Sequence, residues 1–400
     1  MLKIAIKTLI FIEAIIKRRW SRCVPAININ KQLYVNLVTS GSKKCGIATY
    51  STYLATELRK HGKIYITKLT NNRTLSPYYM TLGYKVGRCH DLVHVQFEYG
   101  IFPSLKIGKK TLTAFSALLF YFGLALGNRR VVTTIHEPRK AVTAGGQRGI
   151  FYTWFLDKLV FSVSDLIVVH TKESKLLMKT LYRVNSERIR VIPHGSYEHP
   201  LLLNKEEAKA KFGLKGKTVV TILGFVTPKK GHDLVIPLLL QFEKAVHLVI
   251  AGGPQNAQDE RYLERLMELA KQNRCADRIT FTGYLPDFTS ILNATDIAIL
   301  PYRTVTDSGV LHLLLAHRVP TLASDLAAFQ EVYDEYGCLE LFKSGDSQDL
   351  LLKLRLLLSD MHRQEVLKTK CLDMWNATKW SNIAEMHIEM YRELLSTPCS

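Results

Sequence analysis

The sequence predicts an α/β protein built from two doubly wound, Rossmann-like domains. Three observations lead to this prediction. The chain has 400 residues, which is enough for two ordinary domains. Short apolar strands alternate with helices along it, as in parallel sheets that carry helices on both faces. This alternation stops near residues 201–217, where a short helix is expected, and then restarts. Two such domains in tandem predict a cleft between them, with ligands at the carboxyl ends of the strands.

In the first half, strands are expected where short apolar runs end in turn or polar residues. These runs are Val35–Thr39, Leu92–Gln96, Val131–Ile135, Leu166–His170 and Ile189–Pro193. A glycine-containing loop, Gly41 to Gly46, leads into a helix at about Thr49–His61, and another helix ends near Tyr182. The apolar stretch Leu112–Leu126 is short for a membrane span and favours a buried helix, although its basic borders would also suit lipid headgroups.

In the second half, the strand pattern returns at Val219–Leu223, Leu248–Ala251, Ile279–Phe281, Ile297–Leu300 and Thr321–Ala323. The clearest helix is expected at Asp259–Asn273. We therefore predict an N-terminal extension over residues 1–26, a first domain over 27–200, a second over 201–376 and a closing segment over 377–400.

Charge is divided unevenly between the two halves. Residues 1–200 carry 31 basic and 10 acidic side chains, whereas residues 201–400 carry 23 basic and 25 acidic ones. A basic half indicates nucleic acid, an anionic membrane surface or a phosphorylated substrate as its partner. Residues 4–16 are apolar and basic-flanked, and fit either an amphipathic surface helix or a packed N-terminal extension. The seven cysteines are odd in number and form no C-x-x-C pair, which favours a reducing compartment and argues against a zinc site.

Four segments after expected strands could carry chemistry. Gly224–Gly231 places Lys229 and Lys230 at a helix start, where they could neutralise a phosphate or form a solvated basic turn. Ser308 and Gly309 precede an apolar helix, so Ser308 could accompany backbone N–H groups that bind an anion, or only cap the helix. His136 ends a strand and is either a structural or a catalytic histidine. Gly46 allows a ligand to approach the backbone closely.

Together these segments resemble family 4 of the retaining glycosyltransferases, the group 1 glycosyl transferases. The resemblance runs from about Leu33 to Leu395 and rests on the order of several blocks. They include KKCGIATYSTYLATEL, VVTTIHEP, RIRVIPHG, VVTILGFVTPKKG, HLVIAGGP, ITFTGYLPD and ATDIAILPYRTVTDSGVLHLLLAHRVPTLASD. The resemblance implies a GT-B fold, in which the last helix returns to the first domain. It also implies that a nucleotide sugar binds mainly the C-terminal domain and the acceptor the N-terminal one.

The resemblance also implies roles for single residues. His136 matches the family's histidine near the transferred sugar, and Lys230 matches its lysine on the donor diphosphate. The remaining diphosphate contacts would come from Gly46, Lys229, Ser308, Gly309 and Val310. The nucleobase and ribose contacts would come from Gly224, Gly252, Tyr284, Leu285 and Asp307. We expect Lys230 and the Gly309 and Val310 amides to stabilise charge on the leaving diphosphate, each contributing roughly 3 kcal/mol.

The chain departs from the family at two places. The arginine that accompanies the lysine is missing, with Phe225 or Thr227 in its position. The two glutamates of the second block are replaced by Val305 and Leu313, with Asp307 the nearest acid. Which nucleotide is bound therefore stays open.

We expect transfer of a sugar from a donor such as a UDP- or GDP-sugar to a glycan or lipid-linked saccharide, with retention implied by the family alone. No resident cofactor or metal site is expected, because no ligand cluster is visible. The rivals are another GT-B enzyme, such as an epimerase or phosphorylase, and a non-catalytic basic protein that binds membrane or nucleic acid. No nucleic-acid-binding signature is present, so nucleic acid is not expected. The basic half predicts a cytoplasmic protein, peripheral on the inner face of the cell membrane, that acts in cell-envelope polysaccharide or glycolipid synthesis.

Overall fold

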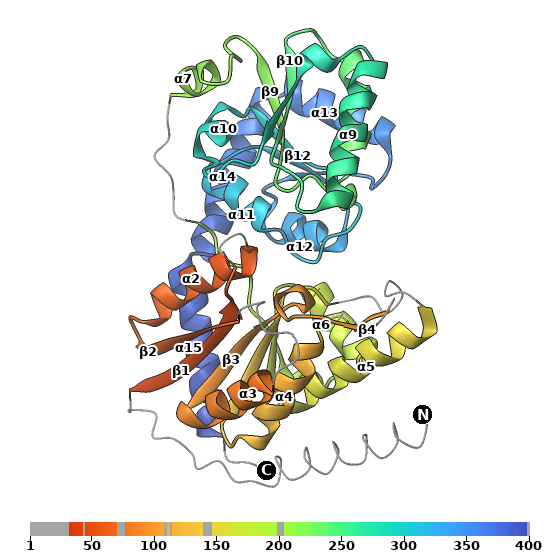
Figure 1. Ribbon diagram of the computed structural model, residues 1–400. Coiled ribbons are helices and arrows are strands. Elements are labelled where there is room, and N and C mark those ends of the chain that lie inside the picture. The colour runs from red at the N-terminus through yellow and green to blue at the C-terminus, as the bar shows by residue number, and fades with distance from the viewer. Residues whose placement is uncertain are drawn as a thin grey trace. The chain divides into compact units, whose positions relative to one another are not determined.

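The chain divides into two compact units (Figure 1). The computed structural model describes residues 32–42, 45–69, 77–107, 110–112, 114–138, 146–197 and 204–397, so the predicted extension at residues 1–26 lies outside the described residues. The N-terminal unit comprises residues 1–195 and 380–400, and the C-terminal unit residues 196–379. The chain passes from one unit to the other after residue 195 and returns after residue 379. The predicted domain limits, at residues 200 and 376, lie within a few residues of these two points.

The N-terminal unit is built on a six-stranded parallel sheet in the order β2-β1-β3-β6-β7-β8. Its strands are β1 (Leu33–Ser40), β2 (Gly62–Leu69), β3 (Leu92–Phe97), β6 (Arg130–Ile135), β7 (Leu166–Val169) and β8 (Ile189–Val191), beside a small antiparallel pair, β4 (Leu105–Ile107) and β5 (Lys110–Leu112). The helices are α2 (Gly46–Leu58), α3 (Tyr78–Cys89), α4 (Phe115–Leu126), α5 (Gly146–Val163), α6 (Lys172–Thr180) and α15 (Trp380–Ser396).

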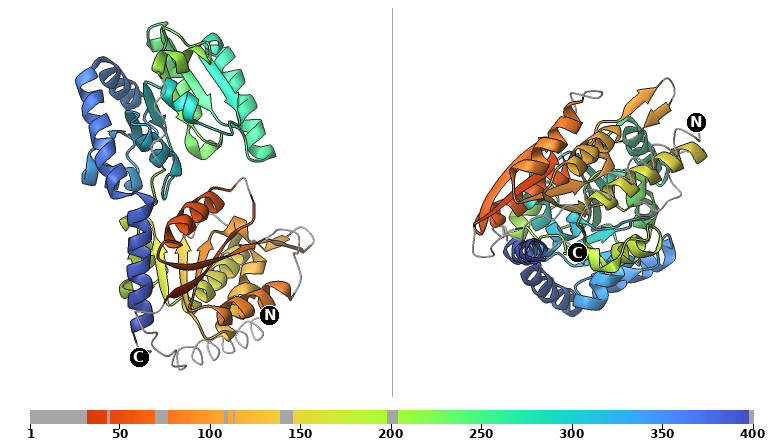
Figure 2. Two further views of the ribbon diagram at one scale, coloured as in Figure 1. Left: turned by 90° about the vertical axis from the view of Figure 1, so that its left-hand side faces the viewer. Right: turned by 90° about the horizontal axis from the view of Figure 1, so that it is seen from below.

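Helices cover both faces of this sheet (Figures 1 and 2). Helices α2 and α15 pack together with one set of strand side chains, and α3, α4 and α5 pack with the other set. The left view of Figure 2 shows the dark-blue α15 running beside the strands. Thus the last helix of the chain completes a core that begins with β1, as the family resemblance implied.

Most of the apolar stretch at residues 112–126 forms the packed helix α4, which begins at Phe115. A side chain at Gly83 of α3 would place its Cβ 2.1 Å from the Phe120 carbonyl oxygen, and one at Gly123 of α4 would approach the Met80 oxygen equally closely. The two helices therefore pack backbone to backbone, which only glycine permits at these points. The buried-helix interpretation of this stretch is confirmed, whereas the suggestion that its basic borders contact lipid headgroups stays a prediction. None of the described helices has the length and apolar character needed to cross a membrane.

The C-terminal unit is built on a second six-stranded parallel sheet, ordered β11-β10-β9-β12-β13-β14. The strands are β9 (Thr218–Leu223), β10 (Val246–Ala251), β11 (Ile279–Gly283), β12 (Ile297–Leu300), β13 (Thr321–Ser324) and β14 (Glu340–Phe342). The helices are α7 (Lys205–Ala210), α8 (His232–Val235), α9 (Ala257–Gln272), α10 (Thr289–Ala294), α11 (Gly309–Ala316), α12 (Ala327–Tyr336), α13 (Ser347–Ser359) and α14 (Met361–Ala377).

The core of this unit also has two layers. Helices α9 and α13 pack on one face of the sheet, and α10, α11 and α12 pack on the other. Counted from β9, the strand order is 3-2-1-4-5-6, the order of a dinucleotide-binding domain. The predicted class, two Rossmann-like domains of a GT-B protein, is confirmed.

Several elements were not predicted from the sequence. They include β2, α3, β4, β5, α5, β14, α13 and α14. The edge strand β2 alternates polar and apolar residues and carries Lys63 and Lys68, so it lacks the continuous apolar run that marks the buried strands. Strand β14 is only three residues long and is also at an edge.

Candidate donor site and histidine cluster

The predicted donor residues of the C-terminal unit follow strands that are neighbours in the sheet. Gly224 follows β9, Gly252 follows β10, and the segment leading to Ser308 follows β12. Strands β10 and β12 flank β9, and all three are parallel. Their carboxyl ends therefore meet at one edge, next to the point between β9 and β12 where the strand order reverses.

Three of these segments come together at Gly224. This residue has a φ of 105°, and a Cβ there would lie 2.5 Å from Lys230 Nζ and 3.1 Å from a Val310 methyl carbon. Gly252, with a φ of 146°, would place a Cβ 2.1 Å from the Gly224 carbonyl oxygen. The glycine after β9 thus lies between the predicted diphosphate lysine and the start of α11.

Lys230 is half-buried and held by neutral oxygens. It ends the short 3-10 turn η3 (Pro228–Lys230) that follows β9, and its Nζ donates to Tyr302 Oη at 2.9 Å and to the Leu223 carbonyl oxygen at 3.3 Å. The same amine lies 4.7 Å from the centre of the Tyr302 ring. Lys229, by contrast, is exposed. Within the described part of the chain, Lys230 has no carboxylate partner, so its charge is available to an anion.

The start of α11 leaves two amides unused by its cap. Ser308 Oγ accepts from the Leu311 amide at 3.2 Å, and the Ser308 amide donates to Asp307 Oδ1 at 2.7 Å. The Ser308 side chain is therefore a helix cap, and among the described residues the Gly309 and Val310 N–H groups are the donors left at this helix end. Such amides, with the helix dipole behind them, favour a bound anion.

The predicted nucleobase segment follows β11. Gly283 pairs with Gly252 in an isolated bridge, and a Cβ on Gly253 would lie 3.2 Å from the Tyr284 amide nitrogen. The loops after β10 and β11 therefore touch, which brings Gly252 and Tyr284 together. The Tyr284 side chain is 56% exposed, whereas Leu285 packs against the core.

Apolar side chains occupy the two positions where the family has glutamates, and both lie in apolar surroundings. Val305 and Leu313 are partly buried and pack against the core under α11. Asp307 approaches the buried His312, with Oδ1 3.9 Å from the ring Nε2, and His312 Nδ1 lies 3.1 Å from Ser196 Oγ. Among the described residues no group of three or more His, Cys, Asp or Glu side chains could hold a metal ion.

His136 belongs to a ring cluster in the N-terminal unit that the sequence did not reveal. Its Nε2 lies 2.8 Å from Gln96 Oε1, and its Nδ1 lies 3.2 Å from His170 Nε2. The Tyr50 ring meets His136 edge-on, with ring centres 4.9 Å apart, and also contacts His170 and His194. Both ring nitrogens of His136 thus have partners within this unit.

The signal for this cluster was present in the sequence but weak. Gln96 lies at the end of β3, and His170 and His194 follow β7 and β8, so all belong to the same carboxyl edge as His136. Beneath them, burial and then the neighbouring His387 hold the pKa of His94 well below its ordinary value, so that this ring is neutral. Gly46 begins α2, and a Cβ there would meet no atom of the described residues within 4 Å.

Comparison with known proteins identifies the class of this chain. The family model described as Glycosyltransferase Family 4 matches residues 45–196, and the one described as Glycosyl transferases group 1 matches residues 216–360. Together they account for most of both units. The chain belongs to this glycosyltransferase family, as the sequence resemblance indicated.

Individual relatives are distant. The chain is 24% identical over 251 residues to a D-inositol 3-phosphate glycosyltransferase of Nocardia farcinica, a match that covers 60% of this chain and 55% of that protein. It is 25% identical over 181 residues to the O-antigen biosynthesis glycosyltransferase WclY of Escherichia coli, covering 42% of this chain and 46% of that one. The chain thus matches about half the length of these curated relatives.

Solved structures agree on the fold. HepE of Anabaena, determined in complex with UDP and glucose, superposes with a TM-score of 0.75 at 14% identity, covering 90% of this chain and 99% of HepE. Sucrose-phosphate synthase of Thermosynechococcus elongatus superposes with a TM-score of 0.71 at 17% identity, covering 92% and 100%. At these identities the likeness concerns the fold.

Proposed function

We propose that the protein is a glycosyltransferase that moves a sugar from a nucleotide-sugar donor to a glycan or lipid-linked saccharide, with retention. One observation carries the proposal: Lys230 Nζ, Gly224 and the first turn of α11 lie together at the carboxyl edge of the C-terminal sheet. A cation, a backbone without a side chain and free helix amides are the groups that a diphosphate requires. Family membership supplies the reaction class.

In this reaction the main task of the protein is to stabilise negative charge on the leaving group. When the bond between the sugar and the diphosphate breaks, negative charge grows on the leaving oxygen. Lys230 and the Gly309 and Val310 amides would stabilise that charge, and each such donor is worth roughly 3 kcal/mol in the transition state. We assign no general base, since the likeness to retaining enzymes implies that the leaving phosphate accepts the acceptor's proton. UDP is our first choice of nucleotide, because HepE was solved with it.

Thermal stabilisation and donor hydrolysis test the proposal. One millimolar UDP or GDP with micromolar affinity should stabilise the protein by about 4 kcal/mol, whereas equal concentrations of nucleoside alone should stabilise it far less. A panel of sugar nucleotides should then identify one donor whose hydrolysis the protein accelerates. If no nucleotide stabilises the chain and no donor is hydrolysed, the proposal is wrong.

A non-catalytic nucleotide-binding protein is the second candidate. It is favoured by the packing of Val305 and Leu313, which leaves apolar side chains where the family carries two glutamates. Stabilisation by UDP without hydrolysis or transfer of any donor in the panel would select this candidate over the enzyme.

We further propose that the protein binds the anionic inner face of the cell membrane. The support is the charge of the first half of the chain, 31 basic against 10 acidic residues. Because α4 is packed, the apolar contribution would have to come from residues 4–22, which lie outside the described residues. Each basic residue near such a surface contributes about 1 kcal/mol. The alternative uses of this charge are solubility and a loosely held anionic polymer.

Liposome sedimentation tests this second proposal. Binding should require anionic lipid and should fall when residues 1–22 are deleted. It should also weaken as the salt concentration is raised from about 0.05 to about 0.5 M, doubling roughly at each step. Equal pelleting with neutral and anionic vesicles, or none with either, would overturn it.

A further inference from the structure

The backbone of the turn that carries Lys230 is held from its outer side by Arg303. The Arg303 amide donates to the Lys229 carbonyl oxygen at 2.8 Å, and its Nη1 donates to the Pro228 carbonyl oxygen at 2.6 Å. Arg303 follows β12, so these bonds tie the segment after β12 to the turn after β9. Two of the three residues of η3 thus have their carbonyl groups fixed by one arginine.

The guanidinium itself is fixed by Asp233 in the first turn of α8. Its Nη1 and Nη2 donate to Asp233 Oδ1 at 3.0 Å and Oδ2 at 2.6 Å, and Tyr262 Oη of α9 donates to the same carboxylate. Burial alone would raise the pKa of Asp233, but the hydrogen bonds from Arg303 and Tyr262 lower it below its ordinary value. The carboxylate therefore stays charged, and a planar fork pairs with it in the bidentate geometry that lysine cannot reproduce.

The residue before Arg303 holds the other end of Lys230. Tyr302 is buried and accepts a hydrogen bond from Lys230 Nζ, as described above. One dipeptide at the end of β12 therefore fixes the amine from one side and the backbone of the turn from the other. The guanidinium does not take the place of the arginine missing from the family's motif, because both of its Nη atoms donate to Asp233 and Nη1 also donates to the Pro228 oxygen.

We propose that Arg303, clamped to Asp233, is a positioning residue that holds Lys230 in place for the donor diphosphate, together with Tyr302. This inference rests on the proposed function of Lys230 in donor binding. It concerns a residue that touches no substrate and acts through the turn. Removing the clamp should leave the fold intact while the turn gains freedom.

Hydrogen exchange tests the clamp without any ligand. The Lys230 and Gly231 amides donate to the Thr227 and Pro228 carbonyl oxygens within the turn. In Arg303→Met these two amides should exchange at least tenfold faster than in the wild type. The matched control is Arg363→Met, because Arg363 makes a comparable ion pair with Glu340 and is 36% exposed against 46% for Arg303. In this control the two amides should keep their wild-type rates.

Kinetics tests the consequence. With the donor that the sugar-nucleotide panel identifies, Arg303→Met should lower kcat at least tenfold and change the donor KM less than threefold, since Lys230 acts mainly on the leaving group. Arg303→Lys should recover only a small part of the loss, and Asp233→Asn should resemble Arg303→Met. Arg363→Met should retain wild-type turnover.

The outcomes separate the inference from the proposed function. If the wild type binds neither UDP nor pyrophosphate and turns over no donor, the proposed function is wrong and the inference falls with it. If the wild type is active but Arg303→Met matches Arg363→Met in exchange and in turnover, only the inference is wrong. Faster exchange with unchanged turnover would also overturn it, since the clamp would then serve the fold alone.

Discussion

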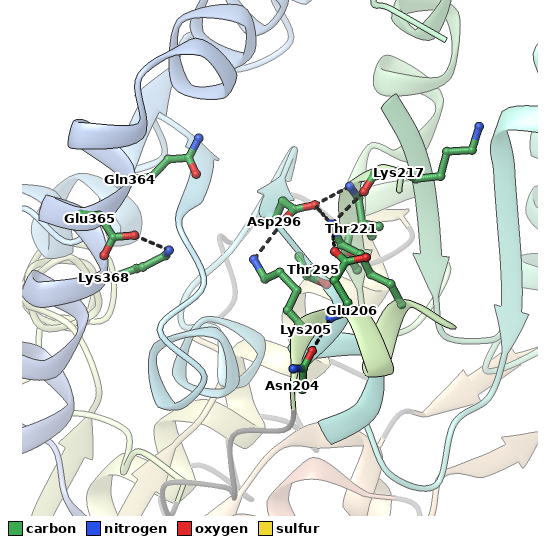
Figure 3. Close-up of polar contacts among 12 residues, drawn as sticks. Asn204, Lys205, Glu206, Lys217, Thr221, Thr295, Asp296, Gln364, Glu365 and Lys368 are labelled. Carbon is green, nitrogen blue, oxygen red and sulfur yellow. Dashed lines mark hydrogen bonds and ion pairs between the residues drawn. The ribbon is translucent and has the colours of Figure 1, made fainter. Parts of the chain in front are cut away.

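The two edges of the C-terminal sheet use lysine in opposite ways. At the amino edge, Asp296 precedes β12 and accepts from Lys205 Nζ at 2.9 Å (Figure 3). It also accepts from Lys209 Nζ at 2.8 Å, and the two bonds fasten α7 to the sheet. The Lys209 side chain is only 7% exposed. At the carboxyl edge, Lys230 has only neutral oxygens as partners among the described residues.

This difference separates charge used by the fold from charge available to a ligand. Asp296 also accepts from the Val219 amide, so the amino edge satisfies its own charges with three donors. The two lysines here are paired with a carboxylate of the fold itself. At the carboxyl edge, Lys230 lies beside a glycine and free helix amides. Its positive charge adds to the partial positive charge of the helix end, so this edge attracts an anion. Substitutions at the two edges should therefore change different properties.

The largest effect is expected for Lys230→Ala. Turnover should fall at least tenfold, and about a hundredfold if Lys230 is the main cation on the diphosphate. The free energy of unfolding should fall by only about 1 kcal/mol, since the lysine has no ion pair to lose and its two hydrogen bonds go to neutral oxygens. Steady-state kinetics and urea unfolding measure both. Lys215→Ala, an exposed lysine of the same unit, is the control and should change neither. Unchanged turnover in Lys230→Ala would remove this lysine from the mechanism.

The reverse result is expected for Lys209→Met at the amino edge. The substitution keeps the apolar stem but removes a buried charge, so Asp296 loses one of its two cations. We expect a loss of about 2 kcal/mol in unfolding free energy, less than for a fully buried pair because Lys205 remains. UDP affinity of the folded protein should stay within twofold of the wild type. A loss of nucleotide binding with unchanged stability would contradict the assignment of the two edges.

The N-terminal sheet offers a second carboxyl edge for the same test. His136→Ala should lower turnover at least tenfold, and it should lower stability by about 1 kcal/mol because Gln96 and His170 each lose a hydrogen-bond partner. His170→Ala should cost similar stability with a smaller effect on turnover. If His136→Ala lowers the melting temperature while the folded fraction keeps full turnover, this histidine is structural only.

The fold was predictable from the sequence wherever a strand is buried on both faces. The run that forms β12 is continuously apolar, and those of β9 and β10 are largely apolar, interrupted within the strands only by Thr221 and His247. Because the carboxyl ends of parallel strands meet at one edge, the sequence also predicts that the segments carrying Gly224 and Val310 lie close together. The edge strand β2 was not predictable in this way, because its solvent-facing residues interrupt the apolar run.

The parts of the site that the sequence did not reveal depend on side-chain contacts over long separations. Arg303 and Asp233 are 70 residues apart, and no local pattern marks either as a partner of the other. His136 was identified by its place after a strand, but its pairing with His170 requires the order of β6 and β7 in the sheet. The positions of these residues after strands could thus be predicted, whereas the side-chain pairs that hold them in place could not.

The ion pairs of Asp296 at the amino edge should also make the stability of the protein depend on pH. Burial alone would raise the pKa of Asp296, but Lys209 and Lys205 lower it below its ordinary value. A carboxyl group with a lowered pKa in the folded state contributes stability above its unfolded pKa of about 3.9, and that stability is lost as the pH falls further. The difference in unfolding free energy between wild type and Asp296→Asn should therefore be full at pH 6 and shrink between pH 4 and pH 2. A difference independent of pH would contradict this.

The smallest effect is a gain in stability at the amino edge. Arg274 follows α9 with a φ of 51°, and the Arg274 and Cys275 amides donate to the Lys271 and Ala270 carbonyl oxygens, which closes a Schellman motif. A side chain in this left-handed conformation costs about 1 kcal/mol, and glycine does not bear that cost. Arg274→Gly should therefore raise the unfolding free energy by roughly 0.5 to 1 kcal/mol, measured by urea unfolding.

The matched control is Lys271→Gly in the last turn of the same helix, where glycine should destabilise by about 1 kcal/mol instead. Turnover should match the wild type in Arg274→Gly, because this loop precedes β11 and lies at the edge away from Lys230. A destabilised Arg274→Gly would mean that the arginine side chain makes contacts that outweigh its backbone strain.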